Sequence, residues 1–342
     1  MKLHLDKTLF RQAVQFTADQ MKIPAIYIEK DYWVTFALYT IFNNEIGKDS
    51  VFKGGTALSK CYQMIERFSE DIDLVVLRRK GESNNQLTNK IKKISKVVAD
   101  VLPEVEIAEL TQKMGMNRKT AHTYAKEFKG NYGQVRDVIV VEATWLGYFE
   151  PYTTKTISSF VGSMMLNNGQ QDIAEANGLL PFELLVLEPT RTICEKIMSL
   201  VRFSYGENPM EDLKKKVRHT YDLHQLLKQK EFSDFFDSTV FEDMLLKVAN
   251  DDVASYKNSN EWLIHHPKEA LLFKDLDNVW EALKVVYNGD FKNLVYGGTL
   301  PSEADVLATL KRIKERLSKI KWTIKKKIKY EVYRSKTGKG LY

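Results

Sequence analysis

The chain has 342 residues, of which 44% are hydrophobic and 28% charged, with two cysteines and a formal net charge of +6. This length allows two domains or one elaborated domain with a large core, and the composition is typical of a soluble globular protein. No run of eighteen apolar residues occurs, which excludes a membrane-spanning helix, and we expect no secretory signal at the N-terminus. Cys61 and Cys194 lie in apolar helical patterns, which favours core thiols over a disulfide and predicts a cytoplasmic location.

Two helices are predicted before residue 43. In residues 7–21, apolar side chains such as Phe10 and Val14 recur at rough helical spacing, and Pro24 closes this region. Residues 28–42 are almost continuously apolar and aromatic, so we expect a second helix with much of its surface buried.

The central stretch is residues 51–76, with the sequence VFKGGTALSKCYQMIERFSEDIDLVV. It predicts a strand, a Gly-Gly turn, a helix and a second strand in a βαβ-like unit. Gly54 and Gly55 end the first strand, and Thr56 is a suitable N-cap for the helix. A helix N-terminus that follows glycines presents free N–H groups that can hold a phosphate, although a simple turn is the alternative.

Two acids, Asp71 and Asp73, lie one residue apart in the second predicted strand. Because side chains alternate along a strand, both carboxylates project from the same face. Two acids at the end of a buried strand repel each other and are costly to desolvate, unless a divalent cation neutralises them or the strand edge is solvated. A phosphate-binding turn beside metal-binding carboxylates is typical of phosphoryl or nucleotidyl transfer.

A further acid lies in the next predicted strand. Residues 111–129 are polar and basic and predict a loop or an edge hairpin, and residues 135–145 predict a buried strand that contains Glu142. An isolated glutamate in such a run is costly unless it is paired or binds a metal. Asp137 competes for this role, but it lies at the strand entrance, where an exposed acid costs little.

The rest of the chain is mainly helical in pattern. A short strand is predicted over residues 182–187, and a helix over residues 188–204, on which Glu195 and Lys196 point to different sides. Another helix is predicted over residues 214–228.

We therefore expect two domains. Residues 1–205 form a mixed α/β core, and residues 206–342 form a helical C-terminal domain that ends in a basic tail. From Lys311 onward there are thirteen Lys/Arg and two Glu, so the rest of the chain is mildly acidic. This distribution predicts a surface for a polyanion such as RNA. Aromatic residues alternate with lysines in residues 321–339, which is compatible with RNA binding; a solubilising tail is the alternative.

Several motifs resemble one family. The segment GGTALSK followed by RFSEDIDL closely resembles the signature of the AbiEii family, nucleotidyltransferase-like toxins of bacterial type IV toxin–antitoxin pairs in the polymerase-β-like superfamily. In the wider superfamily the gap between Gly-Gly and Asp-x-Asp is often shorter than the fifteen residues found here. Residues 29–33 (EKDYW), residues 191–196 (RTxxEK) and residues 219–223 (HxYDL) also resemble AbiEii segments.

The resemblance implies a fold and an activity. The fold is an α/β (α+β) one, with a polymerase-β-like nucleotidyltransferase core, a small mixed sheet and a helical C-terminal domain. The activity is Mg²⁺-dependent transfer of NMP from an NTP to an RNA acceptor, the 3′ end of tRNA, by a growth-arresting toxin with a separately encoded antitoxin.

The resemblance also implies roles for individual residues. Two Mg²⁺ ions are expected on Asp71, Asp73 and Glu142, while Lys196 neutralises charge on the triphosphate. Asp222 either positions Lys196 or acts as a base on the acceptor hydroxyl. The expected phosphate contacts are Gly54, Gly55, Thr56 and Ser69.

Three alternatives use the same parts. The acceptor could be a small molecule or a protein, in which case deletion of residues 321–342 would leave activity intact. The enzyme could be a kinase, which the identity of the leaving group would reveal. The chain could also be an inert scaffold for NTP or RNA, but a scaffold has no need to hold repelling acids such as Asp71 and Asp73 together.

Overall fold

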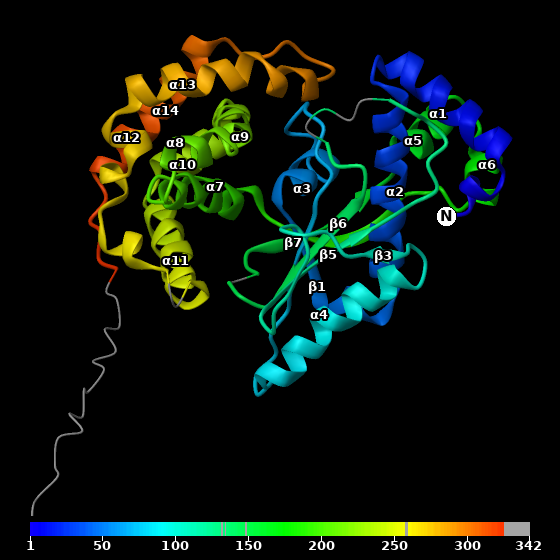
Figure 1. The fold of residues 1–342 in the computed structure, drawn as a ribbon, viewed down its shortest axis with the longest axis horizontal. Helices are drawn as coiled ribbons and strands as arrows, with labels where there is room; N and C mark the ends of the chain where they lie inside the picture. Colours follow the sequence, from blue (N-terminus) through cyan, green and yellow to red (C-terminus); the bar gives the residue numbers. More distant parts are fainter. Residues whose placement is uncertain (131–132, 134, 148, 257–258, 325–342) are drawn as a thin grey trace, which may run out of the picture.

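The computed structural model describes residues 1–324 except 131–132, 134, 148 and 257–258. It confirms the predicted mixed α/β class, because one open mixed sheet is combined with many helices (Figure 1). The strands are β1 Ser50–Lys53, β2 Ile72–Val76, β3 Glu104–Val105, β4 Gln112–Lys113, β5 Asn117–His122, β6 Ile139–Thr144, β7 Tyr152–Ile157 and β8 Phe182–Leu187. The α-helices are α1 Lys7–Met21, α2 Ala25–Phe42, α3 Gly54–Lys60, α4 Asn84–Ala99, α5 Phe160–Asn167, α6 Gln171–Ala176, α7 Pro189–Phe203, α8 Pro209–Lys214, α9 Val217–Leu227, α10 Lys230–Asp237, α11 Thr239–Ser255, α12 Leu271–Lys274, α13 Leu276–Asn288 and α14 Glu303–Ser318.

The strand order in the sheet is β3-β5-β6-β2-β1-β8-β7, with β4 paired to β5. The predicted βαβ-like unit is wrong, because β1 and β2 are antiparallel neighbours. The helix between them, α3, has only seven residues, and the irregular segment 61–71 turns the chain back beside β1. A parallel pair is instead formed by β2 and β6. The three central strands therefore come from two separate parts of the sequence.

Most other predicted elements are present. The strand at residues 182–187 and the helix that begins at Pro189 are confirmed, and residues 111–129 contain the β4–β5 hairpin. The helix predicted over residues 214–228 is interrupted, because α8 ends at Lys214 and α9 begins at Val217. Cys61 and Cys194 are free thiols, as predicted.

The helix α2 is buried on almost every side, including its charged residues. Lys30 forms an ion pair with Glu70 at 3.1 Å, and Asp31 forms one with Lys60 at 2.5 Å. Buried charges are tolerated when they are paired in this way. Through these ion pairs, Lys30 and Asp31 connect α2 to Glu70, the residue that precedes Asp71, and to α3.

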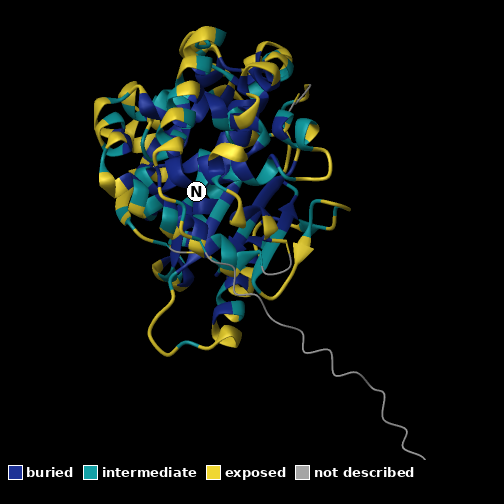
Figure 2. Ribbon diagram, turned by 90° about the vertical axis from the view of Figure 1, so that its left-hand side faces the viewer, coloured by how far each residue is buried: buried dark blue, intermediate teal, exposed yellow. Residues whose placement is uncertain are grey.

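The helices α7 to α14 lie on the opposite side of the sheet from α1, α2, α5 and α6 (Figure 1). Buried residues form a continuous interior, and exposed residues gather on outer helix faces and loops (Figure 2). The segment before Asp71 pairs with the C-terminal half, since the Phe68 N–H donates to Leu294 O at 2.7 Å and the Tyr296 N–H donates to Glu66 O at 2.8 Å. The C-terminal half therefore fixes the loop that leads into β2.

The predicted boundary near residue 205 stays a prediction, and α7, which precedes it, packs against α9 and α11. In the described part of the chain, no helix combines the length and apolar character needed to cross a membrane. Residues 325–342, which carry most of the predicted RNA-binding tail, lie outside the described residues.

Candidate active site

A row of four charged residues crosses the centre of the sheet. The pairing of β1, β2, β6 and β5 brings Lys53, Asp73, Glu142 and Lys119 into register, one on each strand. Directly opposed residues on paired strands have Cβ atoms about 5 Å apart, so the two acids are neighbours, with a lysine on each outer side. The predicted association of Asp73 with Glu142 is therefore a consequence of strand register.

The negative charge in this row is only partly compensated, because Lys53 forms its ion pair with Glu195 of α7, at 2.9 Å, and not with Asp73. Glu142 forms an ion pair with Lys119 at 3.2 Å and accepts a hydrogen bond from Asn117 at 3.1 Å. Burial, together with repulsion from Glu142 and Asp71, raises the pKa of Asp73 to about 7. Raised carboxylate pKa values of this kind are typical of sites that bind a cation or move a proton.

The predicted acids differ in their surroundings. Asp71 forms an ion pair with Arg136 at 2.9 Å and lines the same cavity as Asp73 and Glu142. Asp137, the rejected candidate, is not among the residues that line this cavity, and it pairs with Lys126 at 2.8 Å in an exposed position.

The two glycines before α3 allow close approach to the acids. Gly54 has a φ of +83°, and a Cβ atom there would overlap the Asp73 carboxylate. A Cβ atom on Gly55 would lie 2.6 Å from Nη2 of Arg67 and 3.0 Å from Oγ of Ser69. Any larger residue would therefore displace groups of the site.

The predicted N-cap role of Thr56 is wrong. The helix α3 begins at Gly54, so the cap position is Lys53, three residues before Thr56, and Lys53 makes no side-chain cap bond. Thr56 is buried in the first turn instead, and its Oγ1 lies 3.0 Å from Oγ of Ser69. The two hydroxyls thus form a polar pair on the wall of the cavity.

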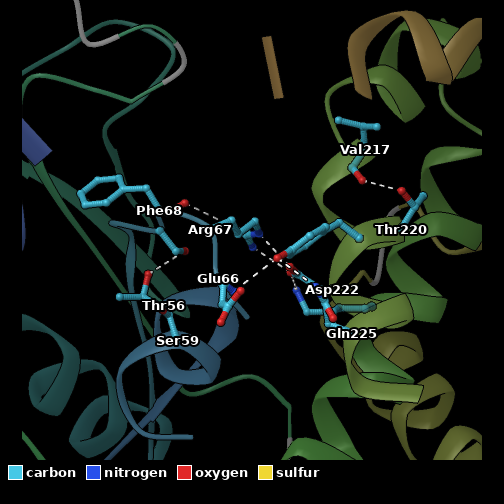
Figure 3. Close-up of polar contacts among 12 residues, drawn as sticks. Thr56, Ser59, Glu66, Arg67, Phe68, Val217, Thr220, Asp222 and Gln225 are labelled. Carbon is cyan, nitrogen blue, oxygen red and sulfur yellow. Dashed lines mark hydrogen bonds and ion pairs between the residues drawn. The ribbon is translucent and has the colours of Figure 1, made fainter. Parts of the chain in front are cut away.

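Asp222 is fully buried and forms ion pairs with two cations, Arg67 and Lys196. Figure 3 shows how Arg67 and Asp222 face each other. Arg67 donates to both of its carboxylate oxygens at 2.7 Å, and Nζ of Lys196 donates to Oδ2 at 2.7 Å. Burial alone would raise the pKa of Asp222, but the charges of Arg67 and Lys196 outweigh it and hold this pKa well below its usual range. Such a carboxylate is a poor base and a strong anchor for the two cations.

A cavity of about 230 Å³, here called the basic cavity, lies beside the acids. It contains the predicted Gly55, Thr56, Ser69, Asp71, Asp73, Glu142 and Lys196. Asp222 does not line the cavity, but it contacts Lys196, which does. Gly54 does not line it either, but it lies against the Asp73 carboxylate. The structure thus brings together most of the residues that the sequence singled out.

Sequence reasoning missed six basic residues that share this cavity. They are Arg67, Lys119, Arg136, Lys215, Lys216 and Arg218. With Lys196, seven cations face three acids, which is an environment suited to a polyphosphate. Local signals existed for part of this set: Lys119 lies in the basic segment 111–129, for which contact with substrate phosphates was the alternative to a solvated loop, and the run Lys214–Lys216 precedes the helix of Asp222.

A second cavity of about 630 Å³ lies between the sheet and the helices α7 and α11, and we call it the sheet–helix cavity. It shares Asp73 and Glu142 with the basic cavity. On α7, Glu195 lines the sheet–helix cavity and Lys196 lines the basic cavity, which confirms that these neighbours point to different sides. A ligand in either cavity therefore reaches the same pair of acids.

The acids match Mg²⁺ in chemistry, since it prefers carboxylate oxygens. The raised pKa of Asp73 also indicates negative charge that a cation would compensate. In the described part of the chain, however, no group of three or more His, Cys, Asp or Glu side chains is arranged to hold a metal ion. Asp71 and Glu142 each form an ion pair, with Arg136 and with Lys119 respectively.

Comparison with known proteins identifies a family and a fold. A family model described as "Nucleotidyl transferase AbiEii toxin, Type IV TA system" matches residues 37–309. The structure is similar to that of MenT4, a nucleotidyltransferase toxin from Mycobacterium tuberculosis H37Rv, with a TM-score of 0.52, 16% identity and 90% of each chain covered. At this identity the likeness concerns the fold. Comparison with curated protein sequences gave no significant match.

Proposed function

The chain belongs to the AbiEii family of nucleotidyltransferase toxins of type IV toxin–antitoxin systems, and we propose that it transfers a nucleoside monophosphate from an NTP to the 3′ end of tRNA. The observation that supports this most strongly is the adjacent pair Asp73 and Glu142 beside a cavity with seven basic side chains. Paired acids next to a polyphosphate site are the arrangement that two-metal phosphoryl chemistry requires.

In the proposed reaction, the acceptor hydroxyl loses its proton to solvent water and its oxygen bonds to the α-phosphorus, while the bond from that phosphorus to the β-phosphate oxygen breaks and pyrophosphate leaves. Asp71, Asp73 and Glu142 would hold two Mg²⁺ ions, which polarise the hydroxyl and neutralise the leaving group when bound. Gly54, Gly55, Thr56 and Ser69 would contact phosphate oxygens around the first turn of α3.

The basic residues have separate tasks in this proposal. Lys196 would neutralise charge that develops on the triphosphate, since an ammonium group can follow phosphate oxygens as they move. Asp222 would be a positioning residue, because it holds Lys196 and Arg67 and its lowered pKa makes it a poor base. Of the two roles left open for Asp222, positioning is therefore the one that we propose.

We further propose a cytoplasmic protein that is restrained by a separately encoded antitoxin. The basic segment 321–342 would contact the backbone of the acceptor RNA, because lysines bind phosphates regardless of sequence. Deletion of this segment separates the alternatives: RNA as acceptor predicts weaker transfer, whereas a small-molecule acceptor predicts no change.

A label-transfer assay tests the activity. The protein is incubated with Mg²⁺, total tRNA and each α-³²P-labelled NTP in turn, beside the double variant Asp71→Ala, Asp73→Ala. We expect label on tRNA with one or two NTPs and none with the variant. Unlabelled tRNA would refute RNA as the acceptor. In a repeat with γ-³²P-labelled NTPs and cell extract, label on any product would identify a kinase instead.

The lysine that precedes α9 makes nucleotide binding sensitive to pH. Burial, with the nearby charges of Arg202 and Arg218, lowers the pKa of Lys216 to about 8. A bound phosphate would raise this pKa, so NTP affinity should be full below pH 8 and fall about 10-fold as the pH rises towards 9.5. Titration of NTP binding between pH 7 and 9.5 measures this decline.

The variant Lys216→Arg is the matched control, because arginine stays charged throughout this range. Its NTP affinity should change little with pH. An equal decline in both proteins would show that Lys216 does not bind the phosphates.

A further inference from the structure

The sheet–helix cavity has the position and size of a site for part of a reacting substrate. Its volume of about 630 Å³ lies in the range of small-molecule sites, and Asp73 and Glu142 form part of its wall. The basic cavity accommodates phosphates, so the adjoining sheet–helix cavity is free for the remainder of a nucleotide. Its lining is also different, since Met114, Met116 and Tyr256 bring apolar and aromatic surface to it.

One wall of the cavity carries a guanidinium whose N–H groups have no hydrogen-bond acceptor among the described residues. Arg202 of α7 lines the cavity and lies over the rings of Tyr256, at 4.4 Å, and Phe203, at 4.7 Å. Its guanidinium forms neither a hydrogen bond nor an ion pair with any described residue, whereas Arg191 on the same helix is bonded to Glu195 and Asp251. The guanidinium is half-buried and borders the cavity, so its N–H groups are available to a ligand that carries acceptors.

A second wall of the cavity carries a carboxylate that can accept hydrogen bonds from a ligand. Asp252 of α11 lines the same cavity, and its carboxylate likewise has no hydrogen bond or ion pair among the described residues. Burial raises the pKa of Asp252 to about 7, although Arg202 opposes this effect. The cavity thus presents a guanidinium and a carboxylate, which influence each other's charge, beside the aromatic ring of Tyr256.

This combination matches the chemistry of a nucleobase. A base has π-faces that stack on aromatic and guanidinium planes, and its edge carries carbonyl or ring-nitrogen acceptors next to N–H donors. Sulfur-containing side chains such as Met114 and Met116 adapt to flat rings. A ribose or a phosphate alone would leave the stacking surface unused.

We propose that the sheet–helix cavity binds the nucleobase of a substrate and selects it, with Arg202 donating to base acceptors and Asp252 accepting from base N–H groups. The inference rests on the proposed nucleotidyl transfer and adds the residues that determine its base preference. The base can come from the NTP or from the terminal nucleotide of the acceptor, and the experiment separates these two sources.

The experiment compares kcat/KM between bases, as ratios, rather than absolute rates. For the wild type, Asp252→Asn and Arg202→Met, kcat/KM is measured with each of the four NTPs, and then with RNA acceptors that differ only in the 3′-terminal base. We expect at least one variant to change the ratio between preferred and disfavoured bases about 10-fold or more, since a paired base edge contributes about 1–3 kcal/mol. A change across NTPs assigns the base to the NTP, and a change across acceptors assigns it to the RNA.

Three controls keep the outcome unambiguous. Asp243→Asn alters an exposed acid of the same helix that does not line the cavity, and its ratios should match those of the wild type. Arg202→Lys keeps the charge without the planar fork, and it replaces Arg202→Met if that variant fails to fold. The ratios are also measured as Kd values, for each NTP without acceptor and for each RNA acceptor without NTP, so the inference is tested even if no transfer occurs.

Unchanged ratios in both Asp252→Asn and the Arg202 variant, for NTPs and acceptors alike, would overturn the inference. That outcome is distinct from failure of the proposed function, in which the wild type itself transfers no label. A decrease in NTP affinity by the same factor for all four bases would also overturn it, because it would indicate a phosphate contact rather than base selection.

Discussion

Replacement of Asp73 by asparagine should lower nucleotidyl transfer at least about a thousand-fold without loss of stability. Asparagine keeps the shape of the side chain but removes the charge that the proposed metal site needs. The same charge is unfavourable in the fold, because burial and repulsion by Glu142 and Asp71 raise the pKa of Asp73 to about 7. The variant should therefore unfold at the same temperature as the wild type or a higher one.

The pH dependence of this difference has a definite sign. The pKa of Asp73 in the folded state, about 7, lies above the ordinary value of 3.8 that is expected in the unfolded state. The folded state thus keeps a proton that the unfolded state releases, and this group lowers stability as the pH rises from about 4 to 7. In metal-free buffer, the melting temperature of Asp73→Asn relative to the wild type should be higher at pH 8 than at pH 5. A variant that melts well below the wild type at pH 8 would contradict the prediction.

Residues whose setting is local could be recognised from the sequence. Asp71 and Asp73 have alternate positions beside an apolar run, and Glu142 interrupts a second apolar run. In both cases the pattern of a single strand determines which face the acid occupies. Lys196 was assigned by family resemblance, and helix geometry separated it from Glu195.

The cationic part of the site depends on contacts between distant residues, which no local pattern encodes. Arg67 meets Asp222 across 155 positions, and Arg136 meets Asp71 across 65. Lys119 meets Glu142 only through the register of β5 and β6. The error at Thr56 has a different origin, because Thr is an ordinary N-cap residue and the sequence did not reveal that Gly54 would itself begin the helix.

Replacement of Asp222 by alanine should affect stability in the opposite direction to Asp73→Asn. We expect it to lower the free energy of unfolding by about 3–5 kcal/mol. The carboxylate is 0% exposed, and its removal would leave the charges of Arg67 and Lys196 buried near each other without a counter-ion. Transfer should be lost as well, because Lys196 would no longer be held. Asp237→Ala is the matched control, since its ion pair with Arg312 is exposed and contributes less than about 1 kcal/mol.

Denaturant unfolding at several pH values distinguishes this ion-pair effect from simple loss of packing. The pKa of Asp222 is lower in the folded state than the ordinary value of 3.8, so its contribution is present above about pH 4 and is lost as the pH falls further. The gap in stability between the wild type and Asp222→Ala should therefore be largest near neutral pH and narrow in acid. A gap that does not change with pH would assign the loss to packing. If Asp222 stabilises the fold and Asp73 destabilises it, Asp222 has a structural role that positions the basic residues, whereas Asp73 is kept for its chemical role in the site.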